Sequence, residues 1–420
     1  WVARDRGEAA LSLSGGGPLG SMTDVAEGSD VADARLRTSL PSFPRKSGPF
    51  SYPPDLTDLA VYQDEWVYFL TRTLGPSGKG GIRFYEMDNE PMLWSVTHAD
   101  VHPEPVSYDY YLDRFLQYAE AVKEVDPSAQ ILAPSVWGWT AYFYSALDIA
   151  MGGPGSAPDR KAHGGVPFLP WFLSKVREHD QQLGVRTLDY LSVHYYPQGG
   201  VFSDDVAPET QARRLRSTRS LWDPTYADES WIATTPEGPF VRLIPRLREW
   251  IEQSYPGTGL AIAEWSWGAE GHISGGLAAA EVLGIFGREG VDLATFWGEV
   301  HQGSPVYWAF RMYRNYDGLG SHFGNISVRA QSSHPDLVSA YASLDTSTGQ
   351  VKVMLINKSP NQEVPVRLIL EGFPRSTVDL FQYSAAHLEG IQQLPRVEVQ
   401  GDTLEQSLPP YSMTMVAAGT

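Results

Sequence analysis

Hydrophobic and polar positions follow two periods along the first three quarters of the chain. Short apolar runs, typical of strands buried on both faces, alternate with stretches in which apolar residues recur every three or four positions. The runs predict strands at residues 81–88, 130–133, 188–194, 260–264 and 291–297. The longer stretches predict helices at 58–73, between Ser107 and Pro127, and at 170–183, 241–254 and 277–288. Strands that alternate with helices indicate βαβ units and a parallel sheet.

The pattern changes after about residue 325. Short alternating stretches then follow one another, at 337–344, 351–357, 364–370, 377–383, 396–399 and 413–417. The first two flank a turn at 345–350 and predict a hairpin. We therefore expect an α/β domain over residues 1–325 and an antiparallel β-sandwich over 326–420. Residues 5–57 are rich in Gly, Ser, Pro and Asp and predict a long loop.

Composition argues against some classes of partner. The chain has 50 acidic and 32 basic residues and a net charge of -18, so its surface repels phosphate backbones and anionic lipid. We expect neither nucleic acid nor a membrane as partner, and no run reaches the ~20 apolar residues of a membrane helix. Cysteine is absent, which excludes disulfides and thiolate chemistry. The chain begins with Trp1 and shows no signal peptide, so we expect a processed product or a fragment.

Aromatic residues are frequent, with 13 Trp and 21 Tyr, many of them beside Gly, Asn or Pro. Flat rings at loop positions can stack on sugars while their polar tips bind hydroxyls. The alternative is that these rings fill the core of a large domain, which is the commoner situation for any single ring. A neutral glycan is not repelled by an acidic surface.

Glu90 is the first candidate for chemistry. It stands in the segment Asn89-Glu90-Pro91, where the predicted strand 81–88 runs out into a loop. Alternating α/β barrels place catalytic groups at the carboxyl ends of their strands. The alternative is a carboxylate that caps the following helix, and the motif alone does not separate the two.

Glu264 is the second candidate. It ends the apolar strand 260–264 and is followed by Trp265 and, two residues later, Trp267. A carboxylate at the end of a buried strand is costly unless it is hydrogen-bonded or used. The alternative is a salt-bridged glutamate, but the setting favours a functional role.

Two carboxylates at one edge of a sheet are what glycoside hydrolysis requires, because one donates a proton while the other attacks or activates water. Other acids compete for these roles. Glu86 and Asp88 precede Glu90 on its strand, and Glu299 follows the strand 291–297. Asp189 and Asp292 begin their strands and belong to the opposite end. We expect all five to be structural.

His194 and Tyr195 end another predicted strand at the same edge. Tyr195 could donate a hydrogen bond that keeps Glu264 ionised, and His194 could orient that carboxylate. The alternative, a satisfied core histidine and a packed tyrosine, fits either residue taken alone.

Known motifs for other chemistries are missing from the sequence. Metalloprotease helices, zinc-ligand spacings, phosphate-binding loops and nucleophile elbows do not occur. We expect no metal in the active site and no required cofactor. A structural calcium ion could bind the Asp-rich early loops, although no spacing indicates one.

These residues lie in segments that closely resemble glycoside hydrolase family 44, a family of endo-β-1,4-glucanases and xyloglucanases. The similar segments span most of the chain and are long and specific: 83–94, 97–103, 137–144, 193–200, 216–224, 264–275, 283–290 and 312–318.

The resemblance implies a (β/α)8 barrel with an attached β-sandwich and a retaining mechanism. It assigns the acid/base to Glu90 and the nucleophile to Glu264, and it places Asn89 against the sugar 2-hydroxyl. Further candidates to line a glucan cleft are Trp94, Trp137, Tyr195, Trp265 and Trp297, with His194 beside the substrate.

The chain departs from the family in three respects. The family's barrel begins before the position of Trp1, so the first strands of the barrel are expected to be missing. Glu86 stands where an apolar residue is more common, and Trp265 stands where Tyr is common.

The sequence thus favours a secreted, monomeric endo-β-1,4-glucanase that acts on cellulose-type glucans or xyloglucan. Two alternatives stay open. One is a non-catalytic glycan-binding fragment, and the other is the same mechanism on xylan or mannan.

Overall fold

The computed structural model describes residues 42–55, 57, 60–99, 102–372 and 377–419. Most of the long loop predicted over 5–57 lies outside these residues. The chain divides into two compact units. The first runs to Tyr195 and includes Leu247–Ala263 and Asp292–Ala294, and the second holds Tyr196–Arg246, Glu264–Val291 and Thr295–Thr420.

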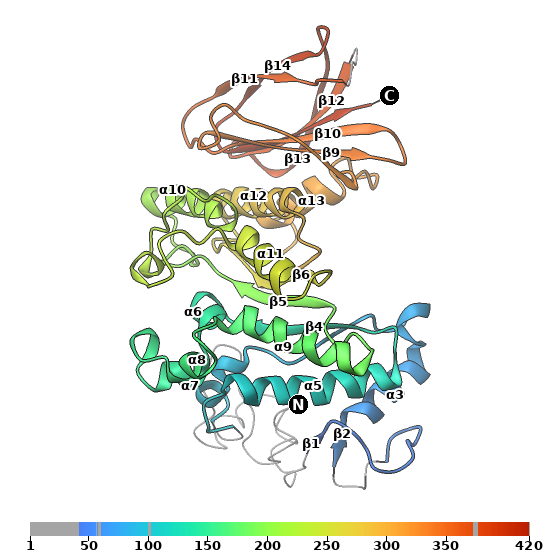
Figure 1. Ribbon diagram of the computed structural model, residues 1–420. Coiled ribbons are helices and arrows are strands. Elements are labelled where there is room, and N and C mark those ends of the chain that lie inside the picture. The colour runs from blue at the N-terminus through green and yellow to red at the C-terminus, as the bar shows by residue number, and fades with distance from the viewer. Residues whose placement is uncertain (1–41, 56, 58–59, 100–101, 373–376, 420) are drawn as a thin grey trace, which may run out of the picture. The chain divides into compact units, whose positions relative to one another are not determined.

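Helices and strands alternate up to about residue 314, as the periodicity predicts (Figure 1). The α-helices are α3 (Gln63–Leu74), α4 (Trp94–Thr97), α5 (Tyr108–Val125), α6 (Trp139–Phe143), α7 (Ala146–Ala150), α8 (Pro158–Ala162), α9 (Phe168–Leu183), α10 (Pro208–Ser217), α11 (Leu243–Ser254), α12 (Ile273–Glu289) and α13 (Pro305–Arg314). Short 3₁₀ helices are η2 (Ser77–Lys79), η3 (Pro91–Leu93), η4 (Gly153–Gly155), η5 (Thr218–Leu221) and η6 (Trp231–Thr234). None of the described helices combines the length and apolar character that crossing a bilayer requires.

One sheet carries the strands of the α/β part, in the order β3 (Phe84–Glu86), β4 (Gln130–Val136), β5 (Tyr190–Tyr195), β6 (Gly259–Trp265) and β7 (Leu293–Phe296). The pairs β3–β4 and β4–β5 are parallel. The described residues supply five of the eight strands of a closed barrel, so this sheet is a partial barrel, as expected. A separate two-stranded parallel pair joins β1 (Ser42–Phe43) and β2 (Val61–Tyr62).

Local signals fix several helix ends. Ser107 caps α5 by accepting a hydrogen bond from the Tyr110 amide at 3.2 Å, as its position predicts. Gly184 and Gly290 take left-handed conformations just after α9 and α12 and end those helices. The helix α12 begins at Ile273, four residues before the prediction, because its first turn holds Gly275 and Gly276, which carry no periodic signal.

The antiparallel strands after α13 are β8 (Ile326–Val328), β9 (Val338–Asp345), β10 (Gln350–Asn357), β11 (Val364–Ile369), β12 (Thr377–Ser384), β13 (His387–Glu398), β14 (Thr403–Leu408) and β15 (Ser412–Ala418). Six of them form a sheet in the order β13-β12-β15-β10-β9-β8, and β11 pairs with β14. The predicted hairpin is confirmed, because β9 and β10 pair across Asp345 and Gln350. Apolar side chains from both sheets share one core, including Val353, Leu380, Leu404, Leu408 and Val416.

Two features of the sandwich differ from the prediction. The strand predicted at 396–399 is the end of the much longer β13, and neither β8 nor β14 was predicted. Most side chains of β13 are exposed, and the strand lies at the edge of its sheet, so it lacks the apolar alternation that marks a strand in the sequence. The predicted domain boundary at 325 falls just before β8, whereas the compact units divide elsewhere, so the domain ranges stay a prediction.

Within the second unit, the sandwich packs directly on α12. The Tyr341 ring of β9 lies against Gly284, where an added Cβ would be only 2.4 Å from the ring. The Tyr341 hydroxyl donates to the buried Glu281 Oε2 at 2.6 Å. A glycine is therefore required at this helix position for the backbone to approach the sandwich so closely.

Candidate active site

Glu90 lies in a backbone conformation that is rare for a residue with a side chain. Its φ is 47° and its ψ is 56°, in the left-handed region, and it directly precedes Pro91, the first residue of η3. The Glu90 amide donates to the Ser135 carbonyl of β4 at 3.0 Å, and its carbonyl accepts from the Leu93 amide at 2.8 Å. Strain of this kind at a strand end is an outlier that points to function, because the surrounding contacts must maintain it.

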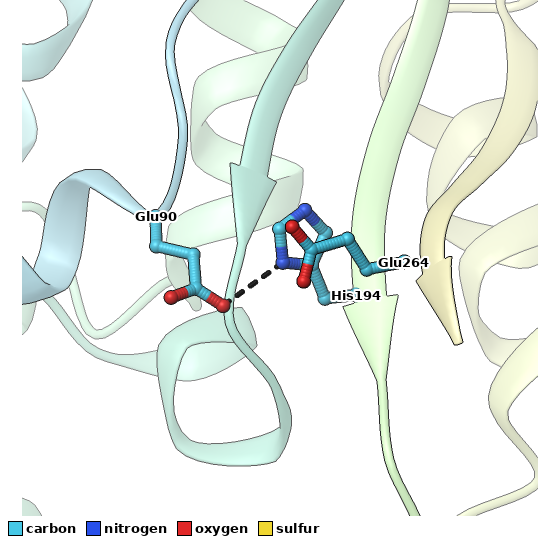
Figure 2. Close-up of side chains that lie close together, drawn as sticks. All are labelled: Glu90, His194 and Glu264. Carbon is cyan, nitrogen blue, oxygen red and sulfur yellow. Dashed lines mark hydrogen bonds and ion pairs between the residues drawn. The ribbon is translucent and has the colours of Figure 1, made fainter. Parts of the chain in front are cut away.

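A buried histidine holds the Glu90 side chain. His194 lies on β5 with no exposed surface, and its Nδ1 is 2.9 Å from Glu90 Oε1 (Figure 2). The Tyr142 hydroxyl donates to the His194 carbonyl, which ties this part of β5 to α6. His194 therefore orients Glu90, and its predicted action on Glu264 stays a prediction.

Glu86 is the last residue of β3, and Asp88 and Glu90 follow outside the strand. Asp88 also has a positive φ, of 66°, so the strand geometry ends before it. Glu86 accepts hydrogen bonds from the hydroxyls of Ser135 and Ser192, and the second of these measures 3.0 Å. Glu86 therefore has a structural role on the neighbouring strands β4 and β5, as expected.

A buried tyrosine of α5 holds the segment that follows β3. The Tyr111 hydroxyl of α5 donates to the Met87 carbonyl at 3.3 Å. Burial raises the pKa of Tyr111 well above its usual value, and the nearby Asp88 and Glu86 act in the same direction. Tyr111 therefore stays protonated and keeps its donor under all working conditions.

Glu264 lies near the end of β6 and is partly exposed. The Tyr196 hydroxyl donates to Glu264 Oε2 at 2.7 Å. Tyr196 was not among the candidates from the sequence, and the predicted contact of Tyr195 with Glu264 stays a prediction. Successive residues of a strand point to opposite faces, so Tyr196 shares the face of His194 while Tyr195 lies on the other. That alternation was the signal that could have identified Tyr196.

Glu90, His194 and Glu264 each place one carboxylate oxygen or imidazole nitrogen within 4.8 Å of the others (Figure 2). Among the described residues, this is the group whose donor atoms could hold a metal ion. One imidazole and two carboxylates can also serve without a metal, as a catalytic acid, a residue that orients it and a nucleophile. The expectation of no active-site metal and no required cofactor stays a prediction, as does the calcium ion of the early loops.

Acids that competed in the sequence occupy structural positions. Asp189 accepts from the Lys123 ammonium and the Ile131 amide, both at 2.8 Å, at the beginning of β5. Asp292 accepts from the Leu260 amide at 2.8 Å at the beginning of β7. Glu299 has a side chain that is 82% exposed beside His301.

The predicted sugar-binding residues divide into exposed and buried groups. Asn89 is exposed, and its carbonyl accepts from the half-buried Trp94 indole at 2.9 Å. Trp137 is half-buried between β4 and α6, and Trp297 is 48% exposed just after β7. These four positions leave surface for a ligand, and their role stays a prediction.

Two of the predicted cleft residues are buried. Trp265 is only 1% exposed, and its ring lies 5.0–6.2 Å from the rings of Phe286, Phe296 and Phe310. Tyr195 is 2% exposed. A ring enclosed in this way cannot serve as an open platform for a sugar, so the cleft-lining interpretation of both residues is corrected to one of core packing.

Carboxylates at the carboxyl ends of parallel strands in a partial barrel, with aromatic rings beside them, define a class of glycan-cleaving folds. Residues 1–199 match the sequence profile of glycoside hydrolase family 44. The chain is 41% identical to CelM2, a bifunctional glucanase-xylanase protein from a metagenome library, with a TM-score of 0.82 over 94% of this chain and 76% of that one. It is 33% identical to a Paenibacillus polymyxa xyloglucanase of family 44 solved with xyloglucan, with a TM-score of 0.82 over 90% of this chain and 74% of that one.

A curated relative agrees with these structures. The chain is 37% identical over 376 residues to endoglucanase A of Paenibacillus lautus, which covers 87% of this chain and 53% of that protein. The chain therefore spans about half the length of this relative. Together the matches show that the chain belongs to glycoside hydrolase family 44, and the predicted family is confirmed.

Proposed function

We propose that this chain hydrolyses internal β-1,4 bonds of glucans with retention of configuration, with Glu90 as acid/base and Glu264 as nucleophile. The carrying observation is that each carboxylate has a partner suited to its role. The Glu90 carboxyl lies 2.9 Å from the His194 imidazole, which fixes its direction, and Glu264 accepts from the Tyr196 hydroxyl, which favours its ionised form.

The double-displacement route is proposed from membership of glycoside hydrolase family 44. Retaining enzymes keep their two carboxyl groups about 5–5.5 Å apart, whereas inverting enzymes need about 6.5–9.5 Å to admit water. In the first step Glu264 attacks the anomeric carbon while Glu90 protonates the leaving oxygen. In the second step water gives a proton to Glu90 and attacks the anomeric carbon, which breaks the ester bond and releases the Glu264 carboxylate.

The natural substrate is proposed to be a soluble or amorphous β-1,4-glucan or xyloglucan. Support comes from relatives named endoglucanase and xyloglucanase. A polysaccharide cannot enter a cell, which supports the proposal of a secreted enzyme. We propose a monomer, with Asn89, Trp94, Trp137 and Trp297 along the substrate path.

Xylan is a second candidate substrate, because the metagenomic relative with 41% identity is described as a glucanase-xylanase. A xylose unit lacks the hydroxymethyl group that glucose carries at C5. A cleft that makes no contact with this group can therefore bind both xylan and glucan.

The test compares Glu90→Gln and Glu264→Gln with the unchanged protein on carboxymethyl-cellulose, xyloglucan, xylan and mannan. Each variant should lose about 10²–10⁴-fold or more of the rate, because removal of one catalytic carboxylate leaves the protonation or the attack uncatalysed. The matched control is Glu299→Gln, whose exposed side chain should leave the rate unchanged. Near-normal rates in both active-site variants would reject the assignment. Binding without any product from the unchanged protein would select the non-catalytic alternative.

A further inference from the structure

Arg214 of α10 is a buried cation whose resolved hydrogen bonds all run to neutral oxygens. Its side chain has no exposed surface. Nε donates to the Trp267 carbonyl at 3.0 Å, and Nη1 donates to Ser274 Oγ at 3.0 Å. Nη2 donates to three backbone carbonyls, those of Val201 at 3.2 Å and of Ser203 and Asp205 at 2.9 Å.

Such an arrangement is specific to arginine. A buried charge is costly unless polar groups surround it, and here five oxygen dipoles do so. The planar guanidinium directs its donors to several points at once, whereas a lysine ammonium cannot reach all of them. Burial lowers the pKa of Arg214, yet an arginine remains charged in proteins.

Four of the five acceptors of Arg214 belong to two loops that follow neighbouring strands of the sheet, and the fifth, Ser274, lies in the first turn of α12. Val201, Ser203 and Asp205 follow β5, and Trp267 follows β6. The loops touch at Gly268, where φ is +70° and an added Cβ would lie 2.6 Å from the amide nitrogen and carbonyl oxygen of Ser203. Arg214 therefore joins two loops that are already in backbone contact.

A second connection closes a ring between α10 and the β6 loop. The buried Trp267 indole donates to Ser217 Oγ at 3.0 Å, and that hydroxyl donates to the Arg214 carbonyl at 3.0 Å. Arg214 thus binds the backbone of Trp267, and Ser217, in the same turn of α10, binds the side chain of Trp267.

Two routes lead from this guanidinium to Glu264. The first runs along the chain, because Trp267 is three residues after Glu264. The second runs through Phe202, which lies between the two held carbonyls of Val201 and Ser203. The Phe202 ring packs against Tyr196 at 4.8 Å between centroids, and Tyr196 donates to Glu264.

We infer that Arg214 is a positioning residue for Glu264, because it holds both the loop that continues from this carboxylate and the loop that backs its hydrogen-bond donor Tyr196. The inference rests on the proposed role of Glu264 as nucleophile. It adds a residue that touches neither substrate nor reacting atoms but fixes the direction of the attacking oxygen.

The test uses Arg214→Lys, which keeps the charge and loses the fork, and Arg216→Met as control. Arg216 lies on the same helix, but its side chain is 45% exposed in a surface ion pair with Glu229. Arg214→Lys should lower kcat on xyloglucan by about 10²-fold with KM nearly unchanged, because a displacement of about 1 Å at a reacting group costs that much. The acid limb of its pH–rate profile should move to higher pH, as Tyr196 no longer supports ionised Glu264. The control should keep kcat and the profile.

A second variant covers the case in which Arg214→Lys does not fold. Ser217→Ala leaves the buried charge in place and opens only the ring to Trp267. It should lower kcat several-fold and shift the same limb in the same direction. If Arg214→Lys is folded with kcat and pH profile equal to those of Arg216→Met, the inference is overturned, and so it is if folded Ser217→Ala matches the unchanged protein.

Hydrogen exchange measured by mass spectrometry tests the positioning role of Arg214 independently of the proposed hydrolytic activity. Amides in 196–205 and 265–268 should exchange faster in Arg214→Lys, or in Ser217→Ala, than in Arg216→Met, while those of β4 should not change. Unchanged exchange in both segments overturns the inference whether or not the protein hydrolyses glucans. Normal activity of Glu264→Gln would instead reject the proposed nucleophile.

Discussion

The two carboxylates are held in opposite ways. Glu90 stands on a strained backbone just past a short strand, and a fully buried imidazole contacts its side chain. Glu264 stands near the end of a regular seven-residue strand, and a tyrosine hydroxyl donates to it. A group that must gain and lose a proton in each turnover has to keep a fixed direction toward the leaving oxygen, which the contact with the buried imidazole provides. A group that must stay ionised needs only donors, and the loops that carry those donors must be rigid.

The largest effects, and the clearest difference between the two carboxylates, are expected when each is removed in turn. On a β-cellobioside with a good aryl leaving group, Glu264→Ala should lose about 10⁴–10⁶-fold, because nothing replaces the nucleophile. Glu90→Ala should form the glycosyl-enzyme at nearly the normal rate on this substrate, since the leaving group needs no proton. Added azide should then yield a β-glycosyl azide with Glu90→Ala only. A β-azide product from Glu264→Ala instead would exchange the two roles.

Loss of the imidazole should have the next largest effect. His194→Asn should lower kcat/KM on xyloglucan by about 10–10²-fold, because the Glu90 oxygen loses the partner that fixes its direction. The loss should be much smaller on the aryl cellobioside, because its leaving group needs no proton from Glu90. Equal losses on both substrates would show that His194 acts beyond Glu90. Circular dichroism should confirm that the buried substitution is tolerated.

Loss of the tyrosine hydroxyl should have a smaller effect. Tyr196→Phe keeps the ring against Phe202 and removes one donor to ionised Glu264. We expect kcat/KM to fall about tenfold, since a hydrogen bond to a charged group contributes roughly 1.5–3 kcal/mol. The fall should be similar on both substrates, and the acid limb of the profile should move to higher pH. Tyr190→Phe, at the other end of β5, is the matched control and should not move that limb.

The smallest effect concerns the pH dependence of stability at the start of α12. His272 caps this helix by accepting from the Ser274 amide, and burial, followed by the charge of Arg214, lowers its pKa below 6.5. The folded state therefore resists protonation, and stability present above about pH 6.5 is lost as pH falls from there through the folded pKa. His272→Asn keeps a cap without a titrating group. Its Tm should fall less between pH 7.5 and 5.5 than that of the unchanged protein.

The exposed His301→Asn serves as control for this measurement, because its side chain is 75% exposed. Its Tm should follow that of the unchanged protein over the same range. If His272→Asn shows the full acid-side fall in Tm, His272 does not contribute to it.

Much of the fold could be predicted from the sequence, because the relevant signals are local. Ser107 and Gly184 marked helix ends through capping chemistry that involves only a few neighbouring residues. The apolar runs of β4, β5 and β6 marked a sheet covered on both faces. The edge strand β13 escaped because an exposed edge imposes no apolar period.

The sequence by itself determined the family, the alternation of strands and helices, and the two glutamates at strand ends. It could not choose between Tyr195 and Tyr196, because that choice depends on which face of β5 meets the neighbouring strand. It could not distinguish the enclosed Trp265 from the exposed Trp297, since both stand at the end of an apolar stretch in the sequence.

Only the tertiary structure showed that His194 contacts Glu90 and that Arg214 joins the two loops after β5 and β6. His194 and Glu90 are 104 positions apart in the sequence. Arg214 is 53 positions from Trp267 and 60 from Ser274. No local pattern encodes such distances, because the partners meet only when the strands lie side by side in the sheet. The physical reason is that a buried imidazole or guanidinium is favourable only once its particular partners surround it.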